Sequence, residues 1–193
     1  MLRAIGAALL SCGLLAGGAR GEDARSVAVP GLDDMRIALP QAWTAVAEPP
    51  PGAVLVIHGP FEPSTTADDL APRPVLALSA VALKPGQSID DLALAATTNA
   101  QRMLADFALD TGGDIHGYLG GRRWSRLRFS FTMAQEPCEE ELWIGVIGGH
   151  AIYIACSCVP SRFDAYESTF SEAIASLDAS RAGLAPPPGS RRH

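Results

Sequence analysis

The strongest constraint on the fold lies between residues 122 and 158, where strand-like segments follow one another closely. Within Arg122–Met133, apolar side chains alternate with polar ones, as they do in an antiparallel strand that buries one face. Leu142–Ile147 and Ala151–Cys158 are mostly apolar and flank Gly148-Gly149. Glycine supplies the positive φ angles that tight hairpins need. The region therefore predicts antiparallel pairing between neighbouring strands.

Further strands are expected before this region. Met35–Pro40 alternates in hydropathy and stops at a proline, and Val54–His58 is a short apolar run between segments rich in proline and glycine. Pro74–Val81 has the same character, and Asp114–Leu119 is a further candidate. Proline and glycine on both sides of such runs indicate the ends of strands.

Two helices are predicted, one in the middle of the chain and one near its end. Ser88 precedes two aspartates, which fits a hydroxyl N-cap followed by acids in the first turn. The second helix is expected to start at Ser161, with Asp164 completing a capping box. Two principal helices packed on a mainly antiparallel sheet define an α+β fold. The apolar face of the first helix is formed by Ile89, Leu92, Ala93, Ala96, Ala100, Met103, Leu104 and Phe107.

The composition limits the classes of protein to which the chain can belong. It has 193 residues, of which 48% are hydrophobic and 19% charged, and its 15 basic and 21 acidic side chains give a formal charge of −6. These values exclude a basic nucleic-acid-binding protein, a highly charged disordered chain and a polytopic membrane protein. The length fits a single domain, placed at residues 27–180, with a disordered tail at 181–193.

The first 19 residues have the plan of a secretory signal peptide. Arg3 precedes an uncharged stretch, Ala4–Ala16, and small residues follow, so cleavage is expected after Ala19, with Gly21 as a second choice. The protein is therefore expected in the bacterial periplasm or outside the cell. Two alternatives remain: a buried N-terminal helix, or a lipobox ending at Cys12. Membrane association is expected only if Cys12 is lipidated.

Four short motifs resemble the PsbP-like fold. They are Leu39-Pro40 with Trp43, the helix start Ser88–Leu92, the turn Gly120–Arg123 and the closing Ile174–Leu177. Together with the order of strands and helices, the resemblance covers residues 30–178. It includes the photosystem II extrinsic protein, DcrB-type and LpqN-type lipoproteins and effector-associated secretion chaperones. The resemblance implies a non-enzymatic protein that binds other proteins, with no catalytic residues to carry over.

Three cysteines remain after signal cleavage, and export into an oxidising compartment favours pairing. If Ile147-Gly148-Gly149 forms a three-residue hairpin loop, Cys138 lies opposite Cys158. A Cys138–Cys158 disulfide is then expected. With a two-residue loop, Cys138 would instead lie near Val159. A Cys138–Cys156 bridge and three free thiols are the other possibilities.

A second function is considered for the same cysteines, namely thiol or metal handling. Cys156 and Cys158, with Cys138 and His150, offer ligands suited to Cu(I) or Zn²⁺. Residues two apart on a strand are separated by about 7 Å, however, which is wide for two thiolates on one metal. We therefore expect no metal and no cofactor. Calcium binding by Asp68 and Asp69 is an alternative that is not expected, because aspartates in a loop of this kind are mostly solvated.

Four residues form a candidate binding surface, in which Trp124 would add contact area to flanking guanidinium groups. An acidic partner or ligand would fit such a surface. The alternative is that the arginines pair with acids of the adjacent strand, Glu139, Glu140 and Glu141, and this alternative is favoured. The candidate binding residues are Arg122, Trp124, Arg126 and Arg128.

No catalytic signature occurs in the sequence. The four histidines are scattered, and no His-Glu-x-x-His, Gly-x-Ser-x-Gly or glycine-rich phosphate loop is found. The sequence therefore predicts a non-enzymatic envelope protein that binds a protein partner or a small ligand, and no nucleic acid.

Overall fold

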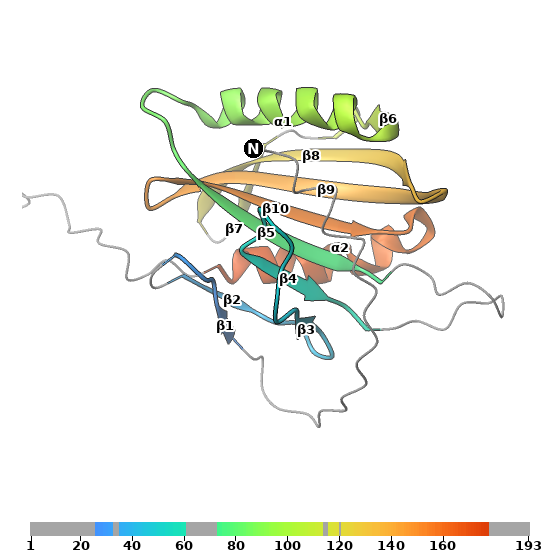
Figure 1. The fold of residues 1–193 in the computed structure, drawn as a ribbon, viewed down its shortest axis with the longest axis horizontal. Coiled ribbons are helices and arrows are strands. Elements are labelled where there is room, and N and C mark those ends of the chain that lie inside the picture. The colour runs from blue at the N-terminus through green and yellow to red at the C-terminus, as the bar shows by residue number, and fades with distance from the viewer. Residues whose placement is uncertain (1–25, 33–34, 61–72, 114–115, 120, 178–193) are drawn as a thin grey trace, which may run out of the picture.

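The computed structural model describes residues 26–32, 35–60, 73–113, 116–119 and 121–177 (Figure 1). The expected signal peptide, Cys12, the tail at 181–193 and the Asp68-Asp69 pair lie outside these residues. The described elements are β1 (Ser26–Ala28), β2 (Arg36–Ala38), β3 (Thr44–Ala45), β4 (Leu55–His58), β5 (Val75–Ala82), α1 (Ile89–Met103), β6 (Ala105–Leu109), β7 (His116–Leu119), β8 (Arg122–Met133), β9 (Glu136–Ile147), β10 (His150–Cys158) and α2 (Pro160–Ala175).

An antiparallel sheet forms the centre of the described structure. Its strands lie in the order β3-β4-β5-β10-β9-β8-β6, and β7 also pairs with β8, beside a different part of that strand from β6. β8 has the bounds that the alternating pattern predicts, Arg122–Met133. β1 and β2 form a separate two-stranded ribbon. The prediction of an α+β fold with a mainly antiparallel sheet is confirmed.

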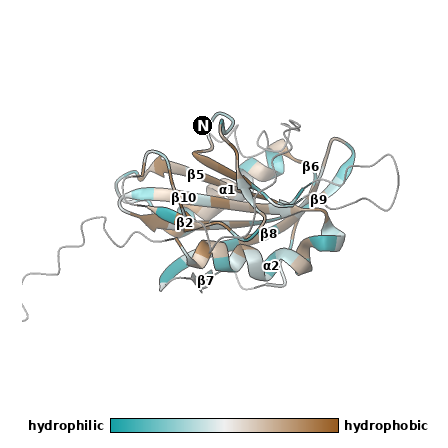
Figure 2. Cartoon of the chain, turned by 90° about the horizontal axis from the view of Figure 1, so that it is seen from below, coloured by the Kyte–Doolittle hydropathy of each residue, from teal (hydrophilic) through white to brown (hydrophobic). Residues whose placement is uncertain are grey.

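The two helices cover opposite faces of the sheet. α1 lies over β8, β9 and β6, whereas α2 lies over β9 and β10 on the other face, where the β1–β2 ribbon also packs (Figure 1). Hydrophobic residues concentrate along the central strands in Figure 2. We call the two resulting clusters the α1-side core and the α2-side core. Leu92, Phe129 and Leu142 belong to the first, and Trp124, Ile154 and Phe163 to the second.

Helix α1 begins as the sequence predicts and ends earlier. The Ser88 hydroxyl accepts a hydrogen bond from the Asp91 N–H at 3.1 Å, and the Asp91 carboxylate accepts one from the Ser88 N–H at 2.9 Å. The helix stops at Met103, so Phe107, expected on its apolar face, lies instead on β6. β6 pairs with β8, and this long-range pairing outweighs the local helical periodicity.

The expected cap of α2 is wrong. The helix starts at Pro160, after Val159, and no side chain caps it. Proline suits the first helical turn because its missing N–H would have no partner within the helix. Asp164 is thereby free of a capping role and bonds to Arg128 of the sheet.

Of the two loop lengths considered for the β9–β10 hairpin, the structure has the shorter. Ile147 pairs with His150, so the loop has two residues, Gly148 and Gly149, with φ angles of 55° and 77°. Two consecutive positive φ angles match the twist of the flanking strands. This register places Cys158 opposite Glu139.

Close packing between tryptophans and glycines fixes the centre of the α2-side core. A Cβ atom at Gly145 would lie 2.6 Å from Cε3 of Trp124, and one at Gly117 would lie 3.0 Å from Trp143. Gly145 therefore leaves no room for a side chain unless Trp124 moves, and Gly117 leaves little room beside Trp143.

None of the helices among the described residues has the length and apolar character of a membrane-spanning segment.

Candidate functional site

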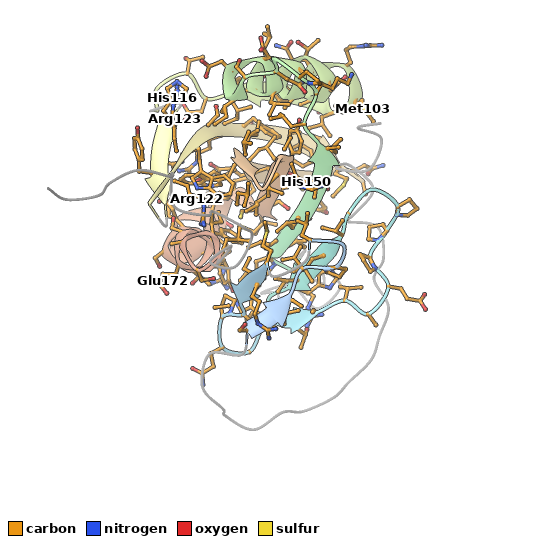
Figure 3. All side chains as sticks on the ribbon, turned by 90° about the vertical axis from the view of Figure 1, so that its left-hand side faces the viewer. Met103, His116, Arg122, Arg123, His150 and Glu172 are labelled. Carbon is orange, nitrogen blue, oxygen red and sulfur yellow. The ribbon has the colours of Figure 1, made fainter. Side chains whose placement is uncertain are left out.

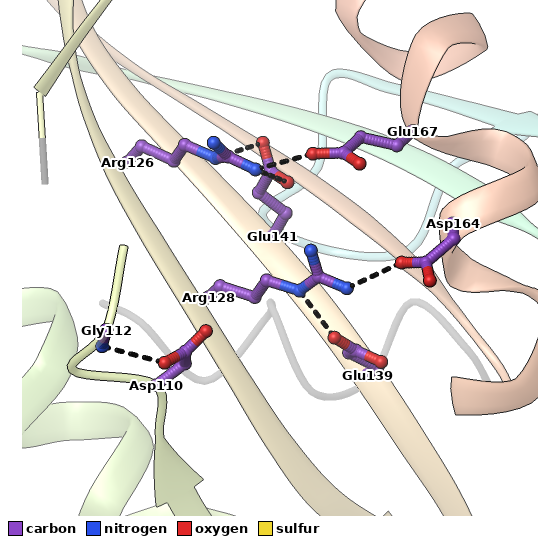
Figure 4. A network of polar contacts seen from close by, with 8 residues as sticks. All are labelled: Asp110, Gly112, Arg126, Arg128, Glu139, Glu141, Asp164 and Glu167. Atoms are coloured by element: carbon purple, nitrogen blue, oxygen red, sulfur yellow. Dashed lines mark hydrogen bonds and ion pairs between the residues drawn. The ribbon is translucent and has the colours of Figure 1, made fainter. Parts of the chain in front are cut away.

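Arg126 joins the sheet to α2 through two carboxylates (Figure 4). Its Nε lies 2.8 Å from Glu141 Oε1, and its Nη2 donates to Glu141 Oε2 at 2.9 Å and to Glu167 Oε1 at 2.8 Å. Burial acts to lower the pKa of Arg126, but the hydrogen bonds and charges of Glu141 and Glu167 outweigh it and raise that pKa. The guanidinium group is held as a fixed cation between β9 and α2.

Arg128 repeats this arrangement two residues further along β8. Its Nε donates to Glu139 Oε1 at 2.5 Å and its Nη2 to Asp164 Oδ1 at 3.1 Å. The guanidinium carbon also lies 4.5 Å from the centre of the Phe163 ring, within the range of a cation–π contact. Burial would lower the pKa of Arg128, but these acids raise it. Both arginines therefore hold α2 onto the sheet.

The exposed surface predicted around Trp124 does not exist in this form. Trp124 is 1% exposed and lies in the α2-side core. Arg122 donates to the backbone carbonyl of Leu177 at 2.9 Å, and Arg126 and Arg128 form the ion pairs described above. The favoured alternative, pairing with the acids of the adjacent strand, is confirmed for Glu139 and Glu141 and wrong for Glu140.

Sequence reasoning missed the contribution of α2 to this network. Asp164 and Glu167 lie three residues apart in that helix, which places them on one face. This spacing was the available signal. It could not identify Arg126 and Arg128 as the partners, because the arrangement of α2 over β8 and β9 is a property of the whole fold.

The three cysteines lie on opposite faces of the sheet. Cys138 belongs to the α1-side core, whereas Cys156 and Cys158 belong to the α2-side core. None of the three forms a disulfide. The expected Cys138–Cys158 disulfide is therefore not formed, because the two-residue loop moves Cys138 out of register with Cys158 and turns it to the other face. The same separation prevents the Cys138–Cys156 pair.

Burial governs the chemistry of the Cys138 and Cys156 thiols. Burial raises the pKa of Cys138 and raises that of Cys156 well above its usual range, and nearby glutamates add to both effects. A protonated thiol is a weak nucleophile and a weak metal ligand. The sheet also separates Cys138 from the other two cysteines, so the three-thiolate metal site is wrong. The described residues contain no group of three or more His, Cys, Asp or Glu side chains arranged to hold a metal ion.

Glu140 is the one acid of the β9 run that faces the α1-side core. It lies between Cys138 and Leu142 on that face, its side chain is buried at 3% exposure, and its Oε1 has no hydrogen-bond partner. Burial raises the pKa of Glu140 to about 8. The three consecutive glutamates suggested a solvated run, but alternation along a strand places Glu140 with the apolar residues.

An exposed patch lies at the end of the sheet beside the start of α1 (Figure 3). We define the hairpin patch as His116 and Tyr118 of β7, Arg123 of β8 and Asp90 of α1. Arg123 Nη2 lies 3.3 Å from His116 Nε2 and 3.7 Å from Asp90 Oδ1. Tyr118 is 76% exposed, the highest value among the large apolar and aromatic side chains of the described residues. Within those residues β7 pairs only with β8, so its outer edge is open.

Comparison with solved structures shows the fold. The cyanobacterial PsbP protein CyanoP of Synechocystis sp. PCC 6803 matches with a TM-score of 0.55 and 14% identity, over 86% of this chain and 98% of that one. LpqN of Mycobacterium tuberculosis, involved in cell envelope biogenesis, matches with a TM-score of 0.53 and 14% identity, over 80% and 84%. PA94 of Pseudomonas aeruginosa, a protein of unknown function, matches with a TM-score of 0.54 and 12% identity, over 81% and 97%.

The chain therefore has a PsbP-like fold, as the sequence motifs indicated. No protein-family model matches the sequence. No curated protein matches it either.

Proposed function

We propose that this protein is an exported, non-enzymatic binding module of the bacterial cell envelope and that it engages a protein partner through the hairpin patch. Export is supported by the charged start and the apolar stretch Ala4–Ala16. An envelope role is supported by the shared fold with LpqN, itself involved in cell envelope biogenesis.

The observation that carries the choice of surface is the exposure of Tyr118 on an open strand edge. A tyrosine supplies a large rigid contact area together with a hydroxyl group, which makes it a frequent centre of binding energy. The adjacent Arg123 and His116 add hydrogen-bond donors. An extended segment of a partner could continue the sheet by pairing with β7.

The other edges of the sheet are less suited to such pairing. The pairing of β6 with β8 shifts register between Ala105 and Ala108, and Asp106 there has a φ angle of 54°. Such bulges and charges protect a strand edge from additional pairing. At the opposite side of the sheet, β3 has only two residues. Among the strand edges of the described residues, β7 is the one that presents Tyr118, which is 76% exposed.

The test is site-specific photo-crosslinking in the native envelope. A photoreactive phenylalanine analogue is placed at Tyr118 and, as a control, at Leu94, an α1 residue that is 70% exposed. We expect a discrete protein adduct from position 118 that is absent from position 94. The partner, identified by mass spectrometry and then purified, should bind the wild type and bind Tyr118→Ala at least tenfold more weakly, while Leu94→Ala leaves binding unchanged. Equal adducts at both positions, or equal affinities for both variants, would overturn the proposed surface.

Export is tested separately by cell fractionation and intact-mass analysis. A mature chain beginning at residue 20 in the periplasm or medium is expected. Recovery of the uncleaved chain from the cytoplasm alone would overturn the envelope role. A diacylated Cys12 as the first residue would establish the lipoprotein alternative.

A further inference from the structure

We propose that Glu140 is a proton-binding switch that controls how tightly β6 and the end of α1 pack on the sheet. In this proposal the neutral carboxyl group keeps the α1-side core closed, and loss of its proton loosens that part of the fold. The inference concerns regulation of the fold and does not depend on the partner proposed above.

The position of Glu140 leaves its negative charge without compensation. It lies in the middle of β9, opposite Phe129 of β8 and Ser157 of β10. Its side chain is 3% exposed and Oε1 accepts no hydrogen bond. A carboxylate that is removed from water and lacks a cation is far less stable than the neutral acid.

The neighbouring ionisable groups do not change this conclusion. Cys138, on the same face of β9, is a thiol whose own pKa is raised by burial and by Glu140. Burial is the sole cause of the raised pKa of Glu140, so no charged group stabilises its ionised form. The ionisable side chains on the elements around this face are Glu136 and Cys138 of β9, Tyr153 of β10, Arg123 of β8, Asp90, Asp91 and Arg102 of α1, Asp106 of β6, Asp110 after β6 and Arg73 before β5.

β6 packs beside Glu140, and the end of α1 that leads into β6 is more exposed than the start of that helix. Phe129, directly opposite Glu140, packs against Phe107 of β6, with 5.1 Å between ring centres. The fully buried residues of α1, among them Leu92 and Ala96, lie in its first half, whereas Met103 at its end is 50% exposed. Ionisation of Glu140 would therefore open the end of α1 and β6 before the centre of the sheet.

The experiment is hydrogen exchange of the mature chain between pH 5 and pH 8, with each rate corrected for the intrinsic pH dependence of exchange. Because opening releases one proton, the opening equilibrium of β6 and of the last turn of α1 should rise by up to tenfold per pH unit. Glu140→Gln keeps the shape of the side chain but cannot ionise, and it should remove this rise. Glu136→Gln, at an exposed position of the same strand, should retain it.

Three results would overturn the proposal: the same pH dependence in Glu140→Gln and wild type, a change confined to the Glu136→Gln variant, or a loss of protection spread equally over β9 and β10. A titration of the glutamate carboxyl carbons by NMR in the wild type needs no variant. It should show one carboxyl group titrating near pH 8, and titration of all glutamates in their usual range would refute the switch even if Glu140→Gln fails to fold.

Discussion

Arg126 Nη2 of β8 and Glu167 Oε1 of α2 lie 2.8 Å apart although the two residues are separated by 41 positions in the chain. The same guanidinium group is paired with Glu141 of β9. Three elements thus meet at one cation. This cation and its neighbour Arg128 determine where α2 lies on the sheet, and the two carboxylates at Arg126 differ greatly in exposure.

That difference predicts unequal effects of two substitutions. Arg126→Met leaves Glu141, whose side chain is 4% exposed, as a buried acid without a partner. Loss of a partner from a fully buried pair costs about 3–5 kcal/mol, and because Arg126 retains 28% exposure we expect about 2–3 kcal/mol. Glu167→Gln removes a pairing with a 41% exposed carboxylate and should cost less than about 1 kcal/mol. Urea denaturation measures the free energy of unfolding of both variants. Equal decreases would show that the burial of Glu141 does not add to the energy of the network.

The packing of Trp124 on Gly145 predicts a steric effect. A methyl group at Gly145 would lie 2.6 Å from the Trp124 ring. This ring lies in the α2-side core and cannot move away freely. Gly145→Ala should therefore destabilise the protein by about 1–3 kcal/mol and alter tryptophan fluorescence in the native state. Gly113→Ala is the matched control, since nothing lies within 4 Å of the added atom. An unchanged melting temperature for Gly145→Ala would contradict this packing.

His58 predicts a loss of stability on acidification. Burial, helped by the charge of Arg73, lowers the pKa of His58 from its ordinary value of 6.5. Below pH 6.5 the unfolded chain therefore binds a proton that the folded chain does not, so stability falls as the pH decreases, by at most about 1.4 kcal/mol per pH unit. The variant His58→Gln should be less sensitive to pH than the wild type between pH 6.5 and pH 5. His116→Gln, at an exposed position, is the control, and identical pH profiles for all three proteins would refute the assignment.

The cysteines predict slow labelling in the folded state. Cys138, Cys156 and Cys158 are buried and form no disulfide, so a thiol reagent should label the native mature chain at less than about a hundredth of the rate found in denaturant. Without a reductant, denaturation should release three thiols per mature chain. Release of only one thiol would mean that two cysteines are paired, which requires a register of β9 and β10 different from the one described here.

Sequence patterns predicted some of the elements whose stabilising contacts are local. The N-cap at Ser88 and the bounds of β8 are confirmed. The capping box expected at Ser161 and Asp164 is equally local but wrong, and the face of β8 that was expected to be polar buries Trp124. The sequence left the β9–β10 register open, because glycines at Gly148 and Gly149 allow loops of either two or three residues, and the expected Cys138–Cys158 pairing is wrong because the loop has two.

The site was less predictable because its features depend on contacts between distant segments. The burial of Trp124 results from α2 and from the missing side chain at Gly145, neither of which is visible in the alternation of β8. Phe107 fitted the helical period but lies on a strand, because pairing with β8 determines its position. Glu140 is two residues from both Cys138 and Leu142, so all three face the same side of the sheet. Alternation, applied to the acidic run, would have predicted this orientation.

The alternation of β9 also affects the charge of the whole protein. Glu139 and Glu141 pair with arginines, whereas burial of Glu140, between them in the sequence, raises its pKa to about 8 and keeps it mostly uncharged at neutral pH. The formal charge of −6 counts all three as ionised. The folded protein at neutral pH is therefore less negative than its composition indicates by one unit, and it should migrate more slowly toward the anode than a folded chain in which Glu140 is ionised.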